Sequence, residues 1–135
     1  MDKDWSKLSE KEWEERLDDE EYRVLRKHGT ERPFTGTHLE NKNDGIYVCS
    51  GCGQELFKSQ SKFNSGTGWP SYYEAINKTA IREIRDESMG MIRVEIRCSR
   101  CDGHLGHVFD DGPKPTGLRY CVNSVSLDFN KSENK

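Results

Sequence analysis

The chain has 135 residues, with 21 Lys and Arg against 24 Asp and Glu, so its formal net charge is −3. This mildly acidic balance argues against a nucleic-acid-binding protein, which needs a basic stripe. No apolar run reaches the roughly 18 residues of a membrane span and no signal-peptide pattern opens the chain, so we expect one soluble, cytoplasmic domain over residues 1–135.

Two short helices are predicted near the N-terminus, because two capping boxes mark their starts. Ser9 is followed three residues later by Glu12, and Asp18 by Glu21. In such a pair each side chain accepts a hydrogen bond from the other residue's backbone N–H. The second helix should end near His28, because the glycine that follows favours a helix C-terminus. The helical segment thus covers about the first 30 residues.

Short antiparallel strands are predicted from residue 45 onward. The segment "GIYVC" (45–49) leads into one cysteine pair and "ELF" (55–57) leaves it, as in a hairpin. "MIRVEIRC" (91–98) ends at a second cysteine pair, and "HLGHVF" (104–109) is the returning strand. "VSLDF" (125–129) alternates apolar and polar residues. The sequence therefore indicates a mainly β fold.

The β core is expected over about residues 31–130. Two parts of it, the strand at 91–98 and the segment at 57–77, indicate which residues face the interior. The strand alternates, which predicts one buried and one charged face. The segment is rich in Ser, Gly and Asn but also in aromatic residues, so we expect a loop packed on the sheet and lining a pocket. The two faces are Ile92, Val94 and Ile96 against Arg93, Glu95 and Arg97, and the loop aromatics are Phe63, Trp69, Tyr72 and Tyr73.

Four of the five cysteines form two Cys-x-x-Cys pairs, Cys49 with Cys52 and Cys98 with Cys101. A tetrahedral zinc site needs four thiolates at about 2.3 Å from the ion, and each such turn supplies two. Only 32% of the residues are apolar, so a metal would add stability to a thin core. We expect one structural zinc that clamps two hairpins. The alternative, that one pair is a redox dithiol, is disfavoured because that motif opens a helix.

Two histidines follow the second cysteine pair, at His104 and His107. They could be further metal ligands, but four thiolates already saturate a tetrahedral ion. Histidines that do not bind the metal are candidates for acid–base chemistry near neutral pH. His28 and His38 have no such neighbours, so we expect ordinary surface histidines at these two positions.

The fifth cysteine, Cys121, lies in "RYCVN". A strand period of two places it on one face with Arg119 and Asn123. A guanidinium and a carboxamide form a polar environment that favours a thiolate and hence a nucleophile. The alternative is an inert buried thiol, which is common for free cysteine. The spacing alone favours the nucleophile only slightly.

Five motifs stand in order between residues 29 and 127: "GTERPFTG", "YVCSGCG", "KFNSGTGWPSY", "CSRCDGHLGHVFDDGP" and "GLRYCVNSVSL". Together they resemble the methionine-R-sulfoxide reductases, the MsrB family, over nearly the whole chain. The resemblance implies a β-tent-like fold of two antiparallel sheets with short N-terminal helices. It also implies one structural zinc per chain, held by the four paired cysteines on the side opposite the active site.

The resemblance also implies the site residues. Cys121 would be the nucleophile, with His107 as the acid and His104 and Asn123 in the same pocket. A thiolate attacks the sulfoxide sulfur, and protonation of the oxygen accompanies the attack. Cys121 would thereby become a sulfenic acid.

Substrate-binding residues follow from the same motifs. Trp69 would lie against the methyl group of the sulfoxide, and Phe109 and Arg119 would complete the pocket. Arg119, paired with Asp111, would support the thiolate and the nearby loop.

One position departs from the family's commonest pattern. Many members carry a cysteine just before "GWP" that forms an internal disulfide, whereas this chain has Thr67. We therefore expect a one-cysteine reductase. Its substrate would be peptide-bound methionine-R-sulfoxide, with the free amino acid as an open alternative, and a monomer is the default expectation. An external thiol would regenerate it: thioredoxin, glutaredoxin or a small thiol. The alternative is a non-catalytic zinc-stabilised β-tent module that binds a ligand or peptide, but it does not explain why Cys121, His107 and Asn123 occur together.

Overall fold

The structure, a computed structural model, describes residues 8–27, 29–32, 34, 36, 38, 39, 41–87 and 90–131. Both predicted helices are present, as α1 (Glu10–Arg16) and α2 (Asp19–Lys27). Ser9 Oγ accepts a hydrogen bond from the Glu12 N–H at 3.2 Å, and the Glu12 carboxylate accepts one from the Ser9 N–H at 2.9 Å. Asp18 and Glu21 form the same pair of bonds. The predicted helix end at His28 lies outside the described residues.

The rest of the fold is mainly β, as predicted. All strand pairings are antiparallel, and they form a three-stranded sheet, β2-β1-β9, and a six-stranded sheet, β3-β4-β8-β7-β6-β5. The strands are β1 (Gly45–Cys49), β2 (Glu55–Lys58), β3 (Lys62–Phe63), β4 (Ser71–Tyr72), β5 (Ile81–Asp86), β6 (Arg93–Cys98), β7 (His104–Phe109), β8 (Arg119–Val122) and β9 (Leu127–Lys131). Single 3₁₀ turns, η2 (Ser59–Ser61) and η4 (Ser124–Ser126), precede β3 and β9.

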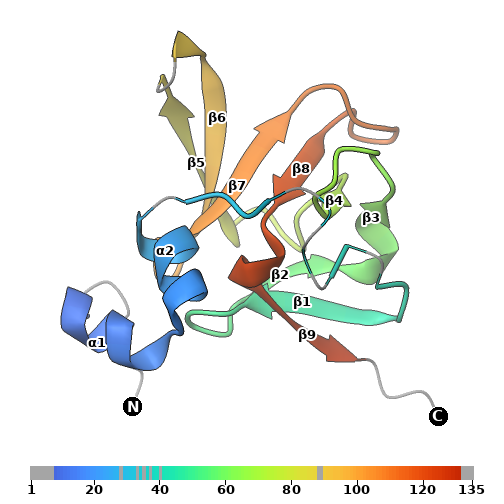
Figure 1. Cartoon of the computed structure of the whole chain (residues 1–135). Helices are drawn as coiled ribbons and strands as arrows, with labels where there is room; N and C mark the ends of the chain where they lie inside the picture. Colours follow the sequence, from blue (N-terminus) through green and yellow to red (C-terminus); the bar gives the residue numbers. More distant parts are fainter. Residues whose placement is uncertain are drawn as a thin grey trace.

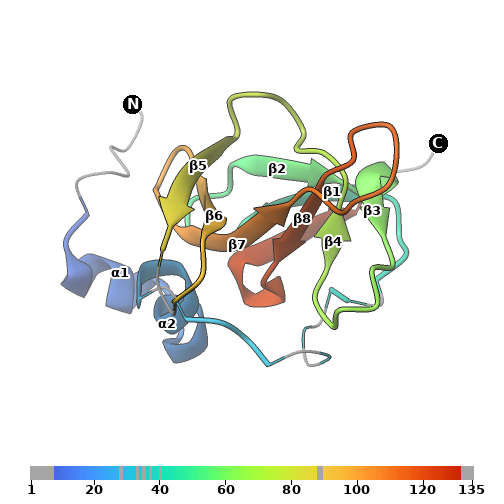
Figure 2. The same ribbon diagram turned by 90° about the horizontal axis from the view of Figure 1, so that it is seen from above.

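Aromatic side chains join the two sheets. Figures 1 and 2 show the larger sheet lying over the smaller one. Tyr47 on β1 and Phe57 on β2 reach Tyr72 on β4, with ring centroids 5.3 Å and 4.4 Å apart, and Phe57 also contacts Tyr120 on β8. Tyr47, Phe57 and Tyr72 are all fully buried. Each such side chain contributes about 1.5–3 kcal/mol by burial, so this layer is a main part of the core.

The structure corrects parts of the predicted strand pattern. Ile92, assigned to the buried face, precedes β6 and is 70% exposed, whereas Glu95 on the charged face is only 6% exposed. The side chains of Arg97 and His104 bind the Glu95 carboxylate and help to cover it. The predicted strand at 125–129 begins two residues late, because Val125 belongs to the turn η4.

Other parts of the β fold were not predicted. The strand β5 has no clear two-residue alternation, and the segment at 57–77 contains the two-residue strands β3 and β4, which are too short to show a period. Within the part of the chain that the structure describes, no helix is long and apolar enough to cross a membrane.

Candidate functional site

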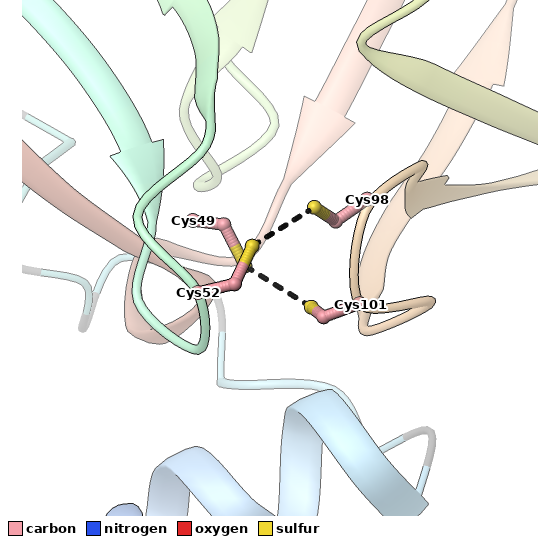
Figure 3. A group of neighbouring side chains, drawn as sticks. All are labelled: Cys49, Cys52, Cys98 and Cys101. Carbon is pink, nitrogen blue, oxygen red and sulfur yellow. Dashed lines mark hydrogen bonds between the residues drawn. The ribbon is translucent and has the colours of Figure 1, made fainter. Parts of the chain in front are cut away.

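The four paired cysteines meet between the two sheets. Cys49 and Cys52 come from the β1–β2 turn, and Cys98 and Cys101 from the β6–β7 turn (Figure 3). Their Sγ atoms all lie within 4.8 Å of one another, with Cys49 to Cys101 at 3.6 Å and Cys52 to Cys98 at 3.5 Å. Four sulfurs bound tetrahedrally at 2.3 Å would lie about 3.8 Å apart. The cluster therefore fits a metal ion that joins the two hairpins, as the spacing predicts.

The N-terminal helices cover this cysteine cluster. Arg16 on α1 donates a hydrogen bond to the Gly51 carbonyl, and Arg26 on α2 donates one to the Cys101 carbonyl at 2.8 Å. The Arg26 guanidinium also lies 4.4 Å from the centre of the buried Trp13 ring. These contacts fasten both helices to the two turns that carry the cysteines.

A separate cavity of about 230 Å³ opens on the larger sheet. None of the four cluster cysteines lines it. Its lining includes all seven residues that the sequence proposes for catalysis and substrate binding: Trp69, His104, His107, Phe109, Arg119, Cys121 and Asn123. The sequence positions from 69 to 123 thus converge on one site.

Cys121 lies in the middle of β8, beside this cavity. It pairs with His107 on β7 and with Ser71 on β4. A histidine therefore flanks it on one neighbouring strand and a serine on the other. A Cβ at Gly106 would clash with the Cys121 carbonyl, so only glycine allows β7 to approach β8 this closely. Burial raises the pKa of the Cys121 thiol, and this outweighs the opposing effects of Arg119 and Thr67. The expected thiolate-favouring environment is therefore only partial.

Two contacts hold Arg119 at the edge of the cavity. Its guanidinium donates hydrogen bonds to both carboxylate oxygens of Asp111, at 2.8 Å and 3.2 Å. It also lies 4.4 Å from the centre of the Phe109 ring. The expected pairing of Arg119 with Asp111 is thus present, and it keeps a positive charge close to Cys121.

Each cavity histidine is bound to a carboxylate. His104 Nδ1 lies 2.7 Å from Glu95 Oε2, and His107 Nε2 lies 2.8 Å from Asp86 Oδ2. Burial acts to raise the pKa of Glu95, but hydrogen bonds from His104 and Arg97 outweigh it and lower that pKa to about 2. Burial lowers the pKa of His107, and the hydrogen bond to Asp86 opposes this effect.

Asn123 and Trp69 both bind the backbone of a residue that the sequence analysis did not single out, Glu31. Asn123 Oδ1 accepts a hydrogen bond from the Glu31 N–H at 3.0 Å, and Trp69 Nε1 donates one to the Glu31 carbonyl at 3.0 Å. The Glu31 side chain is 3% exposed and accepts a hydrogen bond from the Val125 N–H. Asn123 also donates to the Leu105 carbonyl. We call this arrangement the Glu31 clamp.

Arg93 also lines the cavity but was assigned by alternation to a charged strand face. The predicted hairpin of residues 91–98 and 104–109 forms as β6 and β7. The sequence indicates that pairing but does not indicate that Arg93 borders a cavity. His38, expected to be an ordinary surface histidine, is only partly exposed. Its Nε2 lies 3.0 Å from the Leu127 carbonyl, and its ring packs on Tyr47. His28 is outside the described residues.

Known proteins similar to this chain agree with these observations. Residues 17–131 match the SelR domain. The chain is 60% identical to "Peptide methionine sulfoxide reductase MsrB" of Synechococcus sp. (strain RCC307), covering 90% of this chain and 89% of that protein. It is 58% identical to the proteins of the same name from Methanosarcina mazei, covering 93% and 89%, and Acinetobacter baylyi, covering 93% and 90%.

A solved structure is similar in fold. The crystal structure of the Mis18 "Yippee-like" domain superposes with a TM-score of 0.52 and 19% identity, covering 67% of this chain and 99% of that chain. At this identity the likeness concerns the fold alone. The family match and the curated relatives cover most of the chain, so the chain belongs to the SelR domain family of MsrB peptide methionine sulfoxide reductases.

Proposed function

We propose that this chain reduces methionine-R-sulfoxide in peptides to methionine, with Cys121 as the nucleophile. The observation that carries the proposal is that Cys121, His107 and Trp69 line one cavity in a member of this family. The curated relatives bear the name of that activity. A purely ligand-binding module would not need a thiol beside an imidazole in its pocket.

The chemistry transfers one oxygen atom to Cys121. The S–O bond of the sulfoxide breaks and a bond from the oxygen to the Cys121 sulfur forms, which releases methionine and leaves a sulfenic acid. The sulfoxide sulfur gains the two electrons that the Cys121 sulfur loses. The thiol proton ends on the sulfenic oxygen, so the step needs no net proton. His107 can therefore hold the thiol proton while the thiolate attacks and then give it to the oxygen as the acid, so the reacting form carries protonated His107.

The cavity residues support this step in different ways. His107 pairs across the sheet with Cys121, which suits proton transfer between the two reacting groups. The Trp69 indole offers an apolar face for the S-methyl group, and together with a polar side it can distinguish the two sulfoxide epimers. Phe109 and Arg119 complete the substrate pocket. Both ends of the Asn123 amide bind backbone groups, so we assign Asn123 a positioning role.

The cysteine cluster is proposed to hold one structural zinc. Cys49, Cys52, Cys98 and Cys101 would be its ligands, because four thiolates suit a tetrahedral zinc ion. The zinc supplies folding free energy rather than a reactive position, since four protein ligands leave no open coordination site. It would hold the β1–β2 and β6–β7 turns together.

Regeneration of Cys121 is proposed to depend on an external thiol. Two thiols reduce the sulfenic acid to the thiol and give one disulfide and one water molecule. Thr67 stands where many relatives carry a second cysteine, and its side chain lies in the same cavity as Cys121. Thioredoxin, glutaredoxin or a small thiol would supply the electrons to the monomeric enzyme. A reducing compartment such as the cytoplasm provides such thiols.

The test uses a peptide with racemic methionine sulfoxide and dithiothreitol as the reductant. The wild-type chain should consume only the R epimer, and Cys121→Ser should lower kcat/KM at least about a thousandfold, because the nucleophile is lost. Without reductant, mass spectrometry should find one added oxygen, or a thiol adduct, at Cys121. Consumption of the S epimer, or an active Cys121→Ser variant, would refute the proposed function. An internal disulfide between Cys121 and a cluster cysteine would contradict the one-cysteine mechanism.

A further inference from the structure

The carboxylate of Asp86 binds the imidazole of His107 beside the cavity. Asp86 is the last residue of β5 and lies outside the motifs that carry the family resemblance. Its Oδ2 atom lies 2.8 Å from His107 Nε2. We propose that Asp86 is a positioning residue that fixes the orientation and protonation of the His107 imidazole. The role of His107 in proton transfer rests on the proposed function, whereas the pairing itself does not.

The contact reaches diagonally across the sheet. Asp86 pairs with Arg93 on β6, and His107 on β7 pairs with Glu95 on β6, so the Asp86 side chain spans one intervening strand. The Asp86 and His107 side chains are 18% and 14% exposed. At this burial the interaction is screened less by water and salt than a surface ion pair. It can therefore hold the ring in one place.

The chemistry of the pair determines the tautomer. A carboxylate only accepts hydrogen bonds, so Nε2 must carry the proton that Asp86 binds. In neutral His107 the other nitrogen, Nδ1, is then the basic one, and it exchanges a proton with the reacting groups. In the protonated imidazole both nitrogens donate, and the carboxylate stabilises the positive charge.

His107 differs in this respect from its neighbour. His104 is 3% exposed, and Glu95 binds it at 6% exposure, which suits a structural pair. The His107 side chain is 14% exposed against 4% for His104, and the two ring centroids lie 5.7 Å apart. Of the two carboxylate–histidine pairs, the Asp86–His107 pair is therefore the one placed for proton exchange.

Several groups act on His107 besides Asp86. Burial lowers its pKa, the hydrogen bond to Asp86 raises it, and electrostatic interactions with Arg93 and His104 lower it. Arg93 also donates a hydrogen bond to the same Asp86 oxygen at 3.4 Å, so it competes for that carboxylate. The titratable and charged groups around the ring are Asp86 from β5, Arg93 and Glu95 from β6, His104 from β7, and Arg119 and Cys121 from β8.

The test compares the Asp86→Asn variant with the wild type. Glu83→Gln is the matched control, because Glu83 lies on the same strand and is exposed. Loss of the carboxylate should lower the pKa of His107, measured by NMR titration of its ring. The limb of the kcat/KM profile that reports protonated His107 should move to lower pH. At pH 7.5 kcat/KM should fall about tenfold with little change in KM, and the loss should be smaller at pH 5.5. Asp86→Glu should restore part of the activity, and Glu83→Gln should leave both profiles unchanged.

Two results would overturn the proposal. One is an Asp86→Asn variant whose His107 pKa does not fall, or whose activity falls equally at every pH. The other comes from the wild-type protein and does not depend on any variant folding: ¹⁵N spectra above the His107 pKa should show the Nε2–H tautomer, and a dominant Nδ1–H tautomer contradicts the pairing. If the wild-type chain has no reductase activity, the proposed function fails, but the NMR measurements still decide the role of Asp86.

Discussion

The cysteine cluster and the Cys121 cavity use the same side chain for different purposes. In the cluster four buried thiols from two hairpin turns lie within 4.8 Å of one another. In the cavity one partly exposed thiol lies in mid-strand beside an imidazole and an indole. The chemistry of a cysteine thus depends on its neighbours. Four converging thiols can saturate a metal ion, whereas a single thiol beside an acid and an apolar face is suited to react.

The two regions also differ in how their parts are held. Each turn of the cluster is local in sequence, and the metal would join the turns. The cavity is assembled from β6, β7 and β8, from the loop before β4 and from the Glu31 clamp, which are joined by hydrogen bonds and ion pairs. Damage to the cluster should therefore affect the whole fold, and damage to the cavity should affect activity first.

The largest expected effect follows from Cys98→Ser, with Cys121→Ser as the matched control. Removal of one ligand should abolish tight metal binding and cost several kcal/mol, because about 10–16 kcal/mol of zinc-binding energy can appear as folding energy. Metal analysis should find no bound metal in Cys98→Ser, and circular dichroism should show that the variant is unfolded. Cys121→Ser should keep both its metal and its fold. A stable, metal-free Cys98→Ser protein would contradict the distinction between the two regions.

An intermediate effect is expected at the Glu31 clamp. Glu31→Ala removes the side-chain acceptor for the Val125 N–H and loosens the backbone that Trp69 and Asn123 bind, so kcat/KM should fall about tenfold and stability by about 1–3 kcal/mol. Glu31→Gln retains an acceptor and should preserve most of both. Steady-state kinetics and thermal unfolding provide the measurements. Equal activity in Glu31→Ala and the wild type would show that the clamp does not shape the cavity.

How much the sequence predicts differs between the two regions. The cluster was predicted from spacing alone, because two Cys-x-x-Cys turns encode their geometry locally. The capping boxes at Ser9 and Asp18 are local in the same sense, and both form. For Cys121, spacing only slightly favoured a nucleophile over an inert thiol. The other residues of its site were predicted from the family resemblance.

Contacts between distant strands were the part that sequence reasoning missed. Arg93 lines the cavity, and Asp86 and Glu31 bind residues that line it, namely His107 and Trp69. The arrangement of the strands and the path of the N-terminal segment bring them there. A two-residue period assigns each residue to a face of its own strand but does not say which strand will cover that face. This is why Glu95 was assigned to a charged face and is instead buried against His104.

The smallest expected effect concerns Arg119, which lowers the pKa of Cys121 while burial raises it more. Arg119→Gln removes the lowering effect, so the Cys121 pKa should rise further and less thiolate should exist at a given pH. Because the thiolate is the reactive form, alkylation of Cys121 by iodoacetamide should shift to higher pH. At pH 7 the rate of Cys121 alkylation should fall by less than tenfold, which is a smaller change than the one expected for kcat/KM in Glu31→Ala. Arg119→Lys keeps the charge and should shift less. A shift to lower pH in Arg119→Gln would mean that Arg119 does not stabilise the thiolate, and that the cavity tunes its single cysteine mainly by burial.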